Sequence, residues 1–171
     1  RCSFRERMMI PWEKRPVEIA NLLNPAFCGE VLRRCIAKYQ AESARPFPHA
    51  LLFLVLPIVL HRKTRESMPI NTRKQMHAWI MENQEIKIGF AERAKNLIQI
   101  TKEAVAFLLQ IGSLRTNKQG FLIIPTYRPR NISEQNAGEI HDCYKKAEMV
   151  GQWFARTGSP ATIYIVWGVK P

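Results

Sequence analysis

The residues that could carry out chemistry in this chain are few and poorly spaced for it. His141, Asp142 and Cys143 are consecutive in a stretch that predicts a helix, and Asp142 is the sole aspartate of the sequence. Neighbouring side chains on a helix point about 100° apart, so these three cannot form a proton relay among themselves. The glutamates are dispersed and form no obvious pair for metal-assisted phosphoryl transfer. We therefore predict no catalytic residue. A hydrolase that uses His141, Cys143 or a glutamate is the weaker alternative.

Metal and nucleotide sites have equally little support in the sequence. The four cysteines, Cys2, Cys28, Cys35 and Cys143, contain no CxxC pair. A zinc site built on His141 and Cys143 would need distant ligands that no spacing indicates. Neither GxxxxGK[ST] nor GxGxxG occurs in the sequence. We predict no metal site and no cofactor.

The charge of the chain favours an anionic partner. Its 26 Lys and Arg residues outnumber its 14 Asp and Glu residues, and the formal net charge is +12. A field of that size attracts DNA backbone, either directly or as part of a complex, or an acidic protein surface. The basic residues are scattered, so a surface that is simply cationic and soluble is the alternative. The candidate nucleic-acid contacts are Lys63, Lys102, Arg115, Lys118, Arg128 and Arg130.

Several of these basic residues belong to a stretch, residues 86–125, that predicts two helices and a hairpin. Thr101 is placed to cap the second helix, and Gly112 is placed to end it. Two short strands follow, joined by the polar turn 117–120. Helix, turn, helix and hairpin is the order of a winged helix. Winged helices bind nucleic acid or act as protein adaptors.

The predicted second helix carries few side chains for reading DNA bases. Recognition helices usually project Arg, Lys, Asn or Gln toward base edges. This segment offers Lys102, Glu103 and Gln110, with apolar residues between them. An adaptor, or a contact to DNA without sequence preference, is therefore expected ahead of a sequence-specific regulator.

The remaining segments predict a mainly α-helical bundle with a small β element. Residues 1–15 are expected to be extended, and residues 16–171 to form a single compact unit. Within it we expect N-terminal helices over 16–66, the winged-helix-like segment over 71–125, and a long helix with a terminal strand over 133–169. The last strand is expected because residues 161–169 are rich in Ile, Val, Tyr and Trp.

Local signals place the ends of these elements. Asn24 caps a first helix that ends near Ser43, Thr72 opens a capping box, and Ser133 caps the long helix that ends near Thr157. The residues from 61 to 69 predict a basic connector. The apolar run of residues 50–60 predicts a buried helix, or two half-helices kinked at the proline, because it is too short to cross a bilayer. With no signal peptide visible, a cytoplasmic protein with reduced thiols is expected.

Two apolar segments are candidates for a permanent contact with another protein. One is residues 19–27, which lead into the first helix, and the other is the predicted terminal strand, residues 161–169. Packing inside this chain explains both segments adequately, and a subunit interface is the alternative. The candidate interface residues are Leu22, Leu23, Asn24, Phe27, Tyr164 and Trp167.

Long stretches of the sequence resemble the middle component of the three-component ABC systems of bacteria. The stretches are RPVEIANLLNPAFCGEVL, LPIVLHRKTRESMP, GFAERAKNLIQITKEAVAFLLQIG, SEQNAGEIHDCYKKAEMVGQWFA and IVWGVKP. They run from about Arg15 to the C-terminus. The small third subunit of Lamassu-type antiphage systems, which use an SMC-like ATPase, is similar in kind. The resemblance implies no catalytic residue to carry over.

The resemblance implies an accessory subunit that works with an SMC- or ABC-type ATPase and an effector, often a nuclease. Such a subunit would sit on the ATPase and link DNA sensing to the effector, touching DNA through the complex and no membrane. The alternative hypothesis is a stand-alone winged-helix transcription regulator. A regulator should strongly prefer its own promoter, whereas an adaptor should not.

Overall fold

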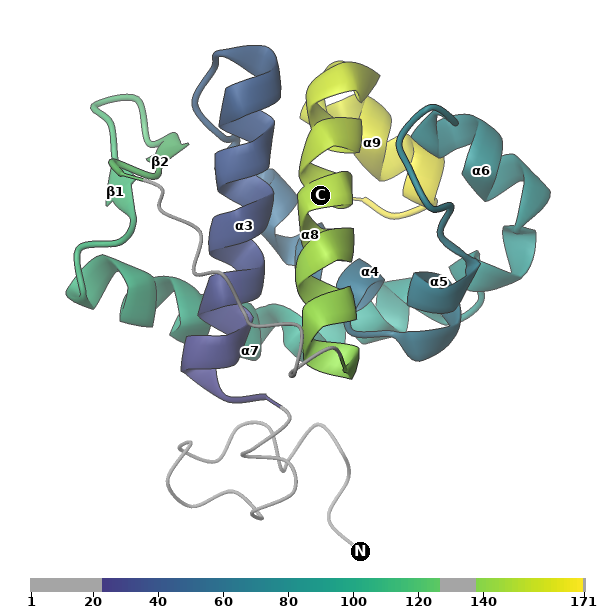
Figure 1. The fold of residues 1–171 in the computed structure, drawn as a ribbon, viewed down its shortest axis with the longest axis horizontal. Coiled ribbons are helices and arrows are strands. Elements are labelled where there is room, and N and C mark those ends of the chain that lie inside the picture. The colour runs from purple at the N-terminus through teal and green to yellow at the C-terminus, as the bar shows by residue number, and fades with distance from the viewer. Residues whose placement is uncertain (1–22, 127–137, 171) are drawn as a thin grey trace, which may run out of the picture.

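Two long helices, α3 (Pro25–Ser43) and α8 (Glu139–Thr157), run side by side through the middle of the molecule (Figure 1). The computed structural model describes residues 23–126 and 138–170. Around the pair lie, in chain order, the 3-10 turn η2 (His49–Leu51), α4 (Leu52–Val59), α5 (Arg62–Ser67), α6 (Met76–Glu82), the 3-10 turn η3 (Gln84–Lys87), α7 (Phe90–Gln110), β1 (Arg115–Thr116), β2 (Leu122–Ile123) and α9 (Pro160–Trp167). The prediction of a mainly α fold with a small β element is confirmed.

The start and end of α3 follow the signals in the sequence. Asn24 Oδ1 accepts a hydrogen bond from Ala26 N at 2.8 Å, so Asn24 is the N-cap. Ala44 adopts a left-handed conformation with φ of 52° and ends the helix after Ser43. Cys28 and Cys35, seven residues apart, are both fully buried on the inner face. The predicted bounds of this helix are confirmed.

The pair α3 and α8 is in very close contact at Gly151. A Cβ atom built on Gly151 would overlap the carbonyl oxygen of Cys35 and would lie 3.1 Å from the backbone nitrogen of Tyr39. Only a residue without a side chain lets the two backbones approach so closely. This close approach explains why a glycine stands at position 151.

The apolar run of residues 50–60 forms the buried centre of the molecule. It begins with η2 and continues as the single helix α4, with Pro57 accommodated inside it. Most of its side chains are fully buried, as expected for a helix that is apolar on all sides. Helices α3, α5, α7 and α8 all pack against it.

An aromatic cluster fills the space between α6, α8 and α9. The rings of Trp79 and Trp153 stack at 5.0 Å, and those of Phe90 and Trp167 stack at 4.4 Å. Trp79 and Trp167 meet edge to face at 6.0 Å. The indole nitrogens of Trp79 and Trp153 each donate to a backbone carbonyl at 2.9 Å. These rings attach the two short helices to the long one.

A buried arginine ties α5 to α4 and α8. Arg65 is 3% exposed and donates to the carbonyl oxygens of Val59 and Leu60, at 3.0 and 3.3 Å, where α4 ends. Its guanidinium also pairs with Asp142 at 2.9 Å and with Glu139 on α8. The lone aspartate of the chain therefore serves an ion pair between helices. Residues 61–69, expected to be a connector, contain this helix, so that prediction is wrong.

The predicted helix-turn-helix is also wrong, because α7 is one continuous helix from Phe90 to Gln110. Thr101 lies in its interior, fully buried, and its hydroxyl donates to the carbonyl of Leu97 at 2.9 Å. That bond is the backbone contact a threonine makes inside a helix, in place of the capping contact we expected. No separate recognition helix begins at Thr101. The winged-helix premise therefore fails at its central turn.

The predicted terminal strand is a helix. Ser159 caps α9 by accepting a hydrogen bond from Thr162 N at 3.3 Å, and Pro160 occupies its first turn. Gly168, with φ of 70°, ends it. The β-branched composition favoured a strand, but the capping residues and burial against the aromatic cluster decided for a helix.

Of the predicted helix boundaries, the start at Thr72 is wrong and the end at Thr157 is right. The capping box at Thr72 is wrong, because α6 begins at Met76 without a side-chain cap and the Thr72 hydroxyl instead bonds to Gln152 at 3.2 Å. The end of α8 at Thr157 is confirmed. Its predicted cap, Ser133, lies outside the described residues, as does the predicted boundary at residues 15 and 16.

The hairpin after α7 forms as predicted. Arg115 pairs with Ile123 and Thr116 with Leu122 in antiparallel register. Leu122 also exchanges two backbone hydrogen bonds with Phe47, both 2.9 Å, so the hairpin is held beside the C-terminal end of α3.

No helix in the described parts of the chain is long and apolar enough to cross a membrane.

Candidate partner-binding surface

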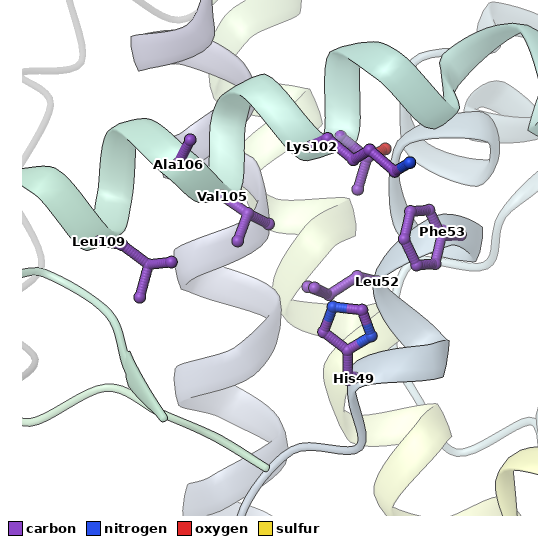
Figure 2. Close-up of a pocket in the computed structure, with 8 residues that line it drawn as sticks. His49, Leu52, Phe53, Lys102, Val105, Ala106 and Leu109 are labelled. Atoms are coloured by element: carbon purple, nitrogen blue, oxygen red, sulfur yellow. The ribbon is translucent and has the colours of Figure 1, made fainter. Parts of the chain in front are cut away.

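A shallow apolar groove lies between α7 and the segment that leads into α4. Its volume is about 210 Å³. Figure 2 shows the α7 side chains on one side and those of η2 and α4 on the other. The lining residues are His49, Leu52, Phe53, Thr101, Lys102, Val105, Ala106 and Leu109.

The groove continues as a partly exposed stripe along α7, in which Val105 is half-buried. Ile98, Lys102, Val105 and Leu109 follow one another at intervals of four, three and four residues, which places them on one face of a helix. Ile98 is 38% exposed and Leu109 is 43% exposed, while Leu108 beside it is buried. The stripe extends about 16 Å along the helix axis. We call these four residues, with Ala106, the α7 stripe.

The opposite face of α7 explains why the stripe is outside. Ile100, Ala104 and Leu108 are buried, and this face packs on α3 and α4. Leu108 lies so close to Gly29 of α3 that a Cβ there would be 3.3 Å from it. The inner face is thus already filled by this chain, and the stripe is left on the surface.

The groove carries positive charge and no carboxylate among its lining residues. Lys102 is exposed, and in Figure 2 its side chain extends along α7 toward Phe53. His49, also exposed, meets the Phe53 ring edge to face at 5.6 Å. The nearest acidic side chain along the helix is Glu103, which lies on the adjoining row and accepts a hydrogen bond from Gln99 at 3.5 Å. The groove is therefore apolar with a cationic edge.

The structure does not gather the predicted nucleic-acid contacts into one patch. Arg115 and Lys118 are exposed together on the hairpin, Lys102 is exposed on α7 and Lys63 on α5. The hairpin and α5 lie at opposite sides of the molecule (Figure 1). Two further candidates, Arg128 and Arg130, lie outside the described residues. Of the described four, only the hairpin residues share an element.

The predicted interface residues fall into two groups. Leu23, Asn24 and Phe27 are half-buried at the start of α3, where the Phe27 ring lies 5.7 Å from that of Tyr144; Leu22 lies outside the described residues. Tyr164 and Trp167 are buried in this chain.

The second group is held by internal contacts. The Tyr164 hydroxyl donates to the carbonyl of Ala50 at 2.7 Å, and Trp167 belongs to the aromatic cluster. This placement agrees with packing inside the chain, the explanation that the sequence favoured over a subunit interface.

The candidate nucleophile for hydrolysis is poorly placed for that chemistry. Cys143 is buried, and burial raises the pKa of its thiol above the usual range. Thiolate is the reactive form, so a raised pKa lowers the reactivity of this cysteine. In the described residues no group of three or more His, Cys, Asp and Glu side chains could hold a metal ion.

Sequence analysis missed the groove, although part of its signal was visible. Val105, Leu108 and Leu109 recur at helical spacing, and the sequence placed them in a short second helix. Only Leu108 of the three is fully buried. If the helical spacing had been followed back to Ile98, across the residues where we expected a turn, the sequence would have indicated the stripe. The contribution of His49 and Phe53 has no local signal, because they are far away in sequence.

Comparison with known proteins shows the family to which this chain belongs. Residues 12–171 match the family described as ABC-three component (ABC-3C) system Middle Component 3. The chain belongs to this family. No curated protein and no solved structure matches it.

Membership in the Middle Component 3 family agrees with the resemblance seen in the sequence and covers nearly the whole chain. It identifies the chain as a component of a multi-component ABC system, and it indicates an accessory subunit. For such a subunit, a surface that contacts other components is the functional feature to look for. Among the described residues, the α7 groove and stripe form one apolar surface on which Ile98 and Leu109 are exposed.

Proposed function

We propose that this chain is a non-catalytic accessory subunit of a bacterial antiphage and anti-plasmid defence complex, related to the Lamassu type. It binds an SMC- or ABC-type ATPase and helps to couple DNA sensing to an effector nuclease. The match to the Middle Component 3 family over residues 12–171 carries this proposal. The burial of Cys143 and the raised pKa of its thiol support a role in which this cysteine is not a nucleophile.

We also propose that the hairpin supplies the contact to DNA within the complex. Arg115 and Lys118 are both exposed there, and the hairpin turn is well ordered by Asn117, whose side-chain oxygen accepts from Gln119 N at 3.0 Å and Phe121 N at 2.9 Å. Such side chains hold phosphates without reading bases. This contact would add to the affinity of the complex and carry no sequence preference.

Assembly is tested by co-expression of the tagged full chain with its genomic neighbours. We expect a large ATPase to co-purify at a fixed ratio, identified by mass spectrometry. Recovery of the chain alone, or as a homodimer that protects one promoter, contradicts the proposal.

The DNA contact is tested on the assembled complex. Replacing Arg115 and Lys118 by Glu should weaken duplex binding and reduce its dependence on salt, because fewer counterions are released. The control carries the same charge change at two exposed positions outside the hairpin, Arg73→Glu with Lys170→Glu. If the Arg115/Lys118 and Arg73/Lys170 double variants weaken DNA binding equally, the effect is one of net charge and the proposed hairpin contact is wrong.

A further inference from the structure

We propose that the α7 groove is the docking site for one amphipathic helix of another component of the complex, a helix that carries apolar anchors and at least one carboxylate. This inference rests on the proposed function and adds the place and the chemistry of the contact. It concerns a surface of the chain that family membership does not describe.

The size of the groove favours anchoring side chains over a small molecule. Its volume is about 210 Å³, below the range of about 300–1,000 Å³ in which small-molecule sites fall. The stripe beside it continues the apolar surface to Ile98 and Leu109. A surface about 16 Å long matches three turns of a helix, the length over which helix-in-groove contacts place their anchors.

The backbone of the groove favours a helical partner over an extended one. The groove wall is α7, whose interior backbone N–H and C=O groups bond within the helix. An extended segment would bring unpaired backbone groups onto an apolar surface and find none to bond, at a cost in desolvation. A helix arrives with its own backbone groups satisfied.

The charge of the groove favours an acidic partner. Lys102 lies in the stripe, Lys95 is exposed seven residues, or two turns, before it, and His49 stands on the facing side, whereas no lining residue is acidic. The chain as a whole carries +12. A partner carboxylate that reaches Lys102 would steer the encounter and set the register of the apolar anchors. Nucleic acid fits less well, since two lysines beside an apolar surface form few contacts to a phosphate backbone.

Cross-linking in the intact complex locates the occupant. A photo-cross-linking amino acid at Ala106, which is exposed in the groove, is placed in the full chain and co-expressed with the other components. We expect a cross-link to one component, mapped by mass spectrometry to an amphipathic helix with Asp or Glu residues. The matched control places the same amino acid at Ala161, exposed on α9. A cross-link from Ala106 only to a second copy of this chain, or to DNA, overturns the inference.

Affinity measurements test the energetics with the purified full chain and the purified ATPase or effector that cross-links. Leu109→Glu should weaken binding by at least about tenfold, because it places a charge among the anchors. Lys102→Glu should also weaken it, and Lys replacement of the facing carboxylate should restore binding to that variant. The controls are Ile165→Glu, at a position 75% exposed on α9, and Lys63→Glu on α5.

The outcomes separate the two proposals. A wild-type chain that joins no ATPase complex overturns the proposed function and this inference together. A complex that forms normally while Leu109→Glu and Lys102→Glu bind as the controls do overturns the inference alone. Circular dichroism and Tm verify that each variant is folded, and the reciprocal charge exchange supports the contact independently of stability.

Discussion

The helices α7 and α8 are similar in length and in amphipathic pattern, yet their outer faces have different surroundings. The inner face of α8 closes on α3, where Gly151 meets the carbonyl of Cys35. Its outer side is edged by ion pairs, among them Arg34 with Glu148 at 2.9 Å. The inner face of α7 is also closed, but its outer side carries the exposed stripe from Ile98 to Leu109. On α8 the exposed Ile140 stands alone near the start of the helix, whereas on α7 Ile98 and Leu109 lie on one face that continues into the groove. Apolar side chains that adjoin one another on a surface are typical of contact sites, and single ones are not.

The comparison gives different expectations for substitutions in the two regions. Changes in the closed regions, the α3–α8 contact and the aromatic cluster beside it, should affect folding. Changes on the α7 stripe should affect binding and leave folding nearly untouched. Four variants can break or sharpen this distinction, and they follow in order of the expected loss in stability.

Trp167→Ala should have the largest effect. Trp167 is 1% exposed and stacks on Phe90, so truncation leaves a large cavity and should lower the free energy of unfolding by about 3–5 kcal/mol. Urea denaturation of the full chain measures it. Ile165→Ala, on the exposed side of the same helix, should cost less than about 0.5 kcal/mol. A folded, stable Trp167→Ala chain that fails only in assembly would return this residue to the interface.

Gly151→Ala should follow, with a loss of about 2–3 kcal/mol from overpacking. The new methyl group would overlap backbone atoms of α3, which cannot move aside as a side chain could. Gly138→Ala is the matched control, because a Cβ at Gly138 meets nothing within 4 Å, and it should cost less than about 1 kcal/mol. Similar losses for the two glycine variants would mean that α3 and α8 are less tightly closed than described.

Arg65→Met should cost about 2 kcal/mol, because the carbonyls of Val59 and Leu60 lose a charged donor in the interior. The loss stays below that of a fully buried ion pair, since Glu139 and Asp142 remain partly exposed to water. Thermal unfolding followed by circular dichroism measures the change. Arg62→Met, on the exposed side of α5, should leave Tm unchanged, and a drop as large as that of Arg65→Met would contradict the assigned role.

Leu109→Glu should have the smallest effect on stability, less than about 0.5 kcal/mol, because the side chain is already 43% exposed and lies outside the core. The neighbouring substitution Leu108→Ala is the control and should cost about 2–4 kcal/mol, since Leu108 is buried against α3. The same urea series compares both. If the two variants lose similar stability, the stripe belongs to the core and the distinction between α7 and α8 fails.

Family membership places these expectations in a multi-component system. The chain belongs to the Middle Component 3 family. An assay of the whole system would not distinguish an unfolded variant from a variant that fails to bind. The paired variants at residues 108 and 109 separate the two causes within one helix.

Local signals in the sequence determined the helical class, the cap at Asn24, the end of α8 at Thr157 and the hairpin at residues 115–123. Each depends on neighbouring residues: a capping side chain, a glycine, or a polar turn between apolar runs. The sequence also showed the net charge of +12 and a spacing of His, Cys, Asp and Glu residues that forms no known catalytic motif. These features need no knowledge of what lies across the core.

Tertiary structure decided the elements for which local preference was ambiguous. Thr101 could cap a helix or lie inside one, and packing of α7 across α3 and α4 placed it inside. Residues 161–167 could form a strand or a helix, and burial of Trp167 among the aromatic rings accompanied the helix. The groove depends on distance in sequence even more, because His49 and Leu109 come together only when α7 crosses the start of α4. Which apolar face of a helix is covered is set by the other elements of the fold, and periodicity alone carries no record of them.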